Sequence, residues 1–181
     1  MANPEMYDFL KILVSVGLGM FGKAIFDYIK DSITKRRERR FIVEYLTNAK
    51  SIFPILDKDY EKVQKIVLKS DLEVYNLGVF EGFNTAILSS LTFPRFYEIF
   101  KKNATPIYRI YGMVNAIQKD LPIPIYEKFV KAVGTIDKNQ SQDVVDDLLN
   151  QQRKIAILTT KLKLVELNLL EASIDDFLSK V

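Results

Sequence analysis

The sequence predicts an all-α protein with a long N-terminal helix, a bundle of shorter helices and a long C-terminal helix. Seven glycines and six prolines among 181 residues leave few breaks, which favours long helices over a fold with many turns. The first fifty residues contain a single proline, at position 4, and a heptad pattern runs through the last forty. A hydrophobic content of 48% with 27% charged residues is typical of a folded chain.

Charge and pattern divide the chain into three expected segments. Residues 1–40 form an apolar helix with a basic end, residues 41–136 an aromatic-rich helical bundle, and residues 137–181 a loop and a long helix that packs on the bundle or between subunits. Residues 1–50 carry nine Lys/Arg against six Asp/Glu, whereas residues 51–181 carry seventeen of each. The whole net charge of +3 therefore lies on the N-terminal segment, which suggests contact with a membrane surface or an acidic partner.

The N-terminal helix has a clear start. Asn3 can cap it, Pro4 suits its first position, and acids in the first turn favour the helix dipole. The apolar stretch 6–29 is long enough to cross a membrane, since ~20 residues span the hydrocarbon core. The same acidic start, with no small-residue cleavage site after it, argues against a secretory signal peptide.

Three interpretations of this helix remain open: a membrane span, a helix lying in the plane of the membrane, and a soluble element that packs on the protein or on another copy. As a span, its lysines would reach opposite interfaces and the basic end would hold the body in the cytoplasm. In the plane, its apolar half would enter the headgroup boundary while the basic end meets anionic lipid. The residues predicted to contact lipid are Lys11, Phe21, Lys23, Lys35, Arg36, Arg37, Arg39 and Arg40.

Small residues in the first helix predict close approach of another helix. Ser15 and Gly19 are four residues apart, and Gly22 follows closely, which is a pattern of helix association in lipid. The alternative is that the glycines only reduce the side-chain bulk of the helix and mark no contact with another helix.

Prolines and caps divide the middle of the chain into shorter helices. We expect aromatic residues at helical spacing to form their core, rather than a nucleic-acid platform. A second apolar stretch, 71–91, is expected to be a buried core helix rather than a re-entrant membrane segment. The expected helices are Phe41–Leu56, Tyr60–Lys69, 71–91, one from Pro94, Ile107–Lys119 and Pro124–Val133, with Leu121–Pro124 as an extended linker.

The C-terminal segment carries the most regular pattern. Its apolar positions alternate steps of four and three for about four heptads, and further leucines flank them, as in a helix inside a bundle or between subunits. The pattern consists of Val144, Leu148, Gln151, Ile155, Leu158, Leu162, Val165, Leu169 and Ala172. We expect Leu148, Ile155, Leu162 and Leu169 to mediate helix association.

The composition excludes several kinds of chemistry. There are no cysteines and no histidines, which removes disulfides, thiol catalysis, the commonest general base and the commonest metal ligand. No glycine-rich phosphate motif follows a strand pattern, and pairs of acids lie where helix capping explains them. We therefore predict no catalytic, cofactor or metal site. Nucleic acid ranks last among partners because the body is neutral.

These observations predict a non-enzymatic, membrane-associated helical protein that self-assembles or anchors partners through helix packing. Its expected partners are membrane lipid and either further copies or another helical protein. The alternative is a soluble structural subunit of a larger assembly, of virion or scaffold type, whose first helix packs between copies. The expected location is the membrane with the body in the cytoplasm, or a cytoplasmic assembly if the first helix does not span.

Overall fold

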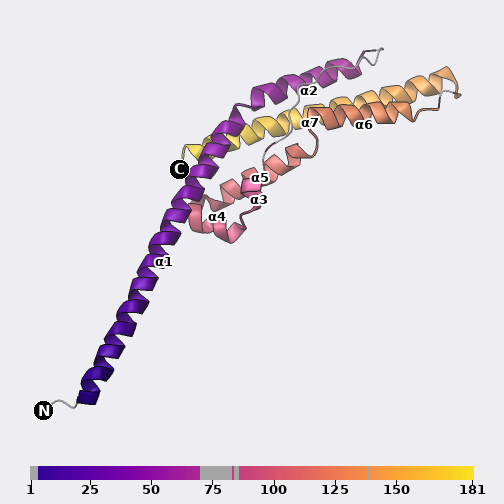
Figure 1. Cartoon of the computed structure of the whole chain (residues 1–181). Helices are drawn as coiled ribbons and strands as arrows, with labels where there is room; N and C mark the ends of the chain where they lie inside the picture. The colour runs from indigo at the N-terminus through magenta and orange to yellow at the C-terminus, as the bar shows by residue number, and fades with distance from the viewer. Residues whose placement is uncertain (1–3, 70–82, 84–85, 138) are drawn as a thin grey trace. The chain divides into compact units, whose positions relative to one another are not determined.

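The computed structural model confirms the all-α fold class in the residues that it describes, which are 4–69, 83, 86–137 and 139–181 (Figure 1). Side chains at 4–15, 18, 86 and 87 lie outside that description. The elements are α1 (Pro4–Lys50), α2 (Phe53–Val67), α3 (Ala86–Ser89), α4 (Phe93–Phe100), the short 3-10 helix η1 (Lys101–Asn103), α5 (Ala104–Gln118), α6 (Pro122–Gly134) and α7 (Gln142–Leu178).

Prolines mark three of the helix starts. Pro54, Pro94 and Pro122 each occupy the first turn of α2, α4 and α6, where a missing N–H costs no helical hydrogen bond. The expected linker Leu121–Pro124 is wrong for this reason: α6 begins at Pro122, and Leu121 alone is extended before it. Most of the predicted helix 71–91 lies outside the described residues.

The chain divides into two units, residues 1–41 and residues 42–181. The first unit is the main part of α1, which continues without a break to Lys50. The last turns of α1 belong to the second unit, where Ile42, Leu46 and Ala49 are buried. Lys50 also forms an ion pair with Asp175 of α7.

The second unit has its core around α7. This helix contacts α2, α5 and α6, while α2 also contacts α6 and α4 contacts α5; α6 and α7 run side by side (Figure 1). Aromatic side chains fill much of the interior, as expected from their helical spacing. Tyr60, Phe96 and Phe177 are completely or almost completely buried, and the ring of Phe100 packs edge-to-face on that of Phe177 at 5.3 Å.

Candidate functional site

The described part of α1 in the first unit exposes large apolar side chains. Phe21 is 72% exposed, and Met20, Ile25, Phe26 and Ile29 are also exposed. An ordinary surface helix exposes few such residues, so their concentration indicates a surface that another molecule or phase covers. Of the residues predicted to contact lipid, Phe21 and Lys23 therefore lie on an accessible surface.

Arg36, Arg37 and Arg40 converge on one face of α1 near the end of the first unit. Together with Ile33 they line a shallow hollow of about 360 Å³. The four residues are spaced i, i+3, i+4 and i+7, which places them on one helix face. We call Arg36, Arg37 and Arg40 the arginine face. The basic cluster is therefore partly sorted by side, a feature that a charge count along the sequence does not reveal.

Other predicted residues of the first helix have different surroundings. Lys35 pairs with Asp31 one turn earlier, at 2.5 Å, and Arg39 lies off the arginine face by helical geometry. Added Cβ atoms at Gly19 and Gly22 would meet nothing within 4 Å, so these glycines permit a close approach that no described residue makes. The side chains of Lys11 and Ser15 lie outside the described residues.

No helix in the part of the chain that the structure describes combines the length and the apolar character that crossing a bilayer requires. The predicted stretch 6–29 lies partly outside that part, because the side chains of 4–15 and 18 are not described.

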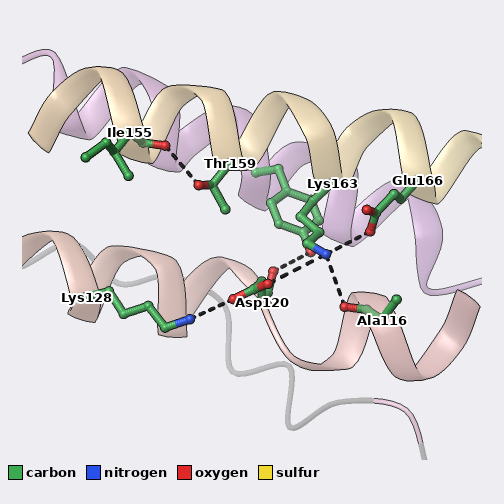
Figure 2. A network of polar contacts seen from close by, with 8 residues as sticks. Ala116, Asp120, Lys128, Ile155, Thr159, Lys163 and Glu166 are labelled. Carbon is green, nitrogen blue, oxygen red and sulfur yellow. Dashed lines mark hydrogen bonds and ion pairs between the residues drawn. The ribbon is translucent and has the colours of Figure 1, made fainter. Parts of the chain in front are cut away.

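The second unit contains an ion-pair network centred on the buried Lys163 of α7 (Figure 2). Lys163 is only 6% exposed. Its Nζ donates to the backbone carbonyl of Ala116 at 3.1 Å and to Glu166 Oε2 at 2.8 Å, and lies 3.6 Å from Asp120 Oδ2. Lys128 of α6 donates to the other oxygen of Asp120 at 2.7 Å. The network thus joins the end of α5, α6 and α7.

Charges in this network are balanced, with two lysines against two carboxylates. The hydrogen bond from Lys128 lowers the pKa of Asp120, with a smaller contribution from the charge of Lys163. Tyr60 donates to the backbone carbonyl of Asp120 at 2.9 Å, and burial raises its pKa. A buried cation that is fully matched in this way fixes neighbouring helices. We therefore assign the network a structural role.

An open hollow of about 250 Å³ lies beside the network, between α6 and α7. Ile125 and Phe129 supply apolar walls, while Lys128 and Thr159 supply polar groups. Thr159 donates its hydroxyl hydrogen to the backbone carbonyl of Ile155 at 2.9 Å (Figure 2). Asp120, Lys128 and Thr159 at this hollow each have a hydrogen-bond partner within the chain.

The heptad residues of α7 do not form its contact with the bundle. Ile155, Leu158, Leu162, Val165 and Leu169 are between 56% and 66% exposed, and we call these five residues the α7 stripe. The bundle is contacted through a different face, whose buried apolar residues are Ala156, Leu167, Leu170, Ile174 and Phe177. Of the four predicted association residues, three belong to the stripe and Leu148 is half-buried.

Comparisons with known proteins give no relative. No protein-family model matches the chain, no curated protein is detectably similar in sequence, and no solved structure matches it. The function is therefore argued from the apolar surface of α1, the arginine face and the α7 stripe.

Proposed function

We propose that this protein is a non-enzymatic, membrane-associated helical protein that self-assembles or anchors partners through helix packing. One observation carries the proposal: exposed apolar residues of α1 lead directly into the arginine face. Phe26, Ile29 and Ile33 are 66%, 50% and 48% exposed, and by helical geometry they lie on the same side as Arg36, Arg37 and Arg40. Apolar side chains followed along the same helix by clustered arginines are typical of a membrane-bound segment whose basic end lies at the lipid headgroups.

The apolar side chains of α1 suit the acyl chains of a membrane, and the arginine face suits the lipid phosphates above them. Apolar side chains gain free energy by leaving water for acyl chains. Arginine forms bidentate hydrogen bonds with phosphate and keeps its charge at any physiological pH. At an anionic surface each arginine contributes about 1 kcal/mol, so that three contribute about 3 kcal/mol, or roughly a hundredfold in partitioning.

The second unit supplies the packing half of the proposal. Its exposed α7 stripe offers an apolar helix face to another helix. Basic residues flanking a membrane-bound segment favour the cytoplasmic side, which would leave the second unit in the cytoplasm.

The soluble structural subunit remains the second candidate, and the α7 stripe favours it as strongly as it favours a membrane protein. In that case the apolar residues of α1 would be covered by other copies of the chain. Binding to lipid distinguishes the two candidates because only the first requires it.

The test is co-sedimentation of the full-length chain with vesicles of phosphatidylcholine, with and without roughly 30% phosphatidylserine, an anionic lipid that gives the surface a negative potential. We expect binding to the anionic vesicles. Replacing Arg36, Arg37 and Arg40 with glutamine should weaken that binding roughly a hundredfold.

A matched control removes the same charge from the second unit, by glutamine at exposed Lys58, Lys131 and Lys154. This variant should bind the vesicles almost as well as the unchanged chain. Equal loss in both triple variants would show that net charge alone acts, and the arginine face would have no special role. Absence of binding by the unchanged chain would reject membrane association.

A further inference from the structure

The α7 stripe is an apolar face that no described residue of the second unit covers. We infer that a second copy of this chain covers it, with the two α7 helices parallel and in register. The inference rests on the self-assembly part of the proposed function and names the partner and the geometry. It does not depend on lipid binding.

Two faces of α7 differ in burial. Leu167, Leu170 and Ile174 point into the bundle and are buried, whereas Leu162 and Leu169 are each 56% exposed. The exposed residues occupy alternate three- and four-residue steps, and the pattern from 144 to 172 covers about four heptads. A seam of that length, with charged residues beside it, is what a two-stranded coiled coil requires.

Residues beside the stripe determine the orientation. Lys154, Lys161 and Asn168 flank it on one side, while Thr159 and Glu166 flank it on the other. In a parallel pair each residue of the first flank faces the residue five positions later in the other copy. Lys161 then faces Glu166, which is 30% exposed and also accepts a hydrogen bond from Lys163 of its own chain, and Lys154 faces Thr159. The interface contains two opposite-charge pairs and no like-charge pair.

In an antiparallel pair the charged residues beside the two stripes are not complementary. Residues of the same flank then face each other, and when Leu162 of one copy packs beside Leu158 of the other, Lys161 lies next to Lys161 of the other copy. Like charges at such positions are unfavourable. No antiparallel register brings Lys161 next to Glu166, so charge complementarity favours the parallel pair.

Gln151 supports the same register. It occupies a core position of the heptad pattern and is exposed in the chain. A polar residue at a core position pairs best with its own copy, which happens only when parallel helices are in register. Such a polar residue in the seam lowers the stability of the dimer somewhat and fixes how the two helices are aligned.

The absence of cysteine from the sequence allows a direct test with single cysteines in the full-length chain. In a parallel, in-register pair, Leu158→Cys and Val165→Cys each meet their own copy at the seam, within the ~7 Å between Cα atoms that a disulfide tolerates. Each variant alone should form disulfide-linked dimers on air oxidation in lipid-free buffer. Asn168→Cys is the matched control because it is exposed on the flank, and it should link roughly tenfold less.

Three results would overturn the inference. In an antiparallel pair Leu158→Cys and Val165→Cys cannot both meet their own copy, so at least one of the two variants would fail to link. Equal linking by all three variants would indicate random collision. If links appear only after residues 1–33 are deleted, the first helix of the chain covers the stripe, and no second copy does so in the intact protein. Because the test contains no lipid, failure of membrane binding leaves its result unaffected.

Discussion

Leu169 and Leu170 are adjacent on α7 but have opposite surroundings, and this difference gives the sharpest mutational prediction. Leu170 is completely buried, whereas Leu169 is 56% exposed. Leu170→Ala should lower the free energy of unfolding by about 2–5 kcal/mol because it leaves a cavity in the core. Leu169→Ala should change the unfolding free energy of the monomer by only about 0.5 kcal/mol or less, as is usual at the surface.

The effect of Leu169→Ala should instead be on dimerisation. Full burial of a leucine side chain stabilises by about 1.5–3 kcal/mol, and the 56% of Leu169 that is exposed is what the second copy would cover. That fraction corresponds to about 1 kcal/mol or slightly more per chain, and about 2–3 kcal/mol for both chains. The dimer Kd should therefore rise roughly 30- to 150-fold.

Two assays separate these effects. Urea unfolding followed by circular dichroism gives the free energy of unfolding, and it should be measured at a protein concentration well below the dimer Kd because association stabilises the folded state. Sedimentation equilibrium gives the Kd. The reasoning is refuted if Leu169→Ala destabilises the dilute monomer as much as Leu170→Ala does, because the stripe would then be packed within the chain.

Three further predictions concern charged residues of the second unit. The pKa of Asp120 is lowered from 3.8 in the folded protein, so its ion pair stabilises the fold above pH 4 and this stability is lost as the pH falls through the lowered pKa. Lys128→Met should flatten that acid dependence in urea unfolding measured at stepped pH. Lys163→Met should lower the free energy of unfolding by about 1–3 kcal/mol because it leaves buried acceptors without their donor, which the same unfolding assay measures; an unchanged value would reject the structural role of the network. Lys161→Glu should raise the dimer Kd roughly five- to tenfold by replacing two favourable pairs with repulsion, whereas Lys154→Glu should leave it nearly unchanged. Sedimentation equilibrium at low and high salt checks this, and equal effects of the two variants would contradict the proposed register.

Sequence patterns were sufficient for the fold class and for the helix that begins near Pro94. The expected helices Phe41–Leu56 and Tyr60–Lys69 have the wrong bounds, because Pro54 begins α2 instead of ending a helix. Proline has a fixed φ and no N–H, so Pro54, Pro94 and Pro122 can begin helices almost independently of their surroundings. The cluster Leu121–Pro124 was harder to interpret because two prolines in three residues suit both an extended linker and a first turn. The structure resolves this ambiguity in favour of the first turn, with α6 beginning at Pro122.

The face of α7 that packs on the bundle could not be predicted from sequence. Both Leu162 in the stripe and Leu167 in the core are leucines, and periodicity alone does not state which face meets which neighbour. The partners of Lys163 were also hidden, since they come from Asp120 and Ala116, more than forty residues earlier. The available signal is a lysine between two leucines in a broadly apolar helix, because a lysine that becomes buried there almost always needs a partner.

Flotation with anionic vesicles of the full-length chain and of a variant lacking residues 1–33, combined with the oligomeric state of each, tests whether the first helix binds lipid. We expect the full-length chain to float with the vesicles, and the deletion variant to stay in solution as a helical dimer held by α7. If the full-length chain remains in solution and the deletion destroys its oligomer, the first helix packs between copies rather than against lipid, and membrane association is wrong.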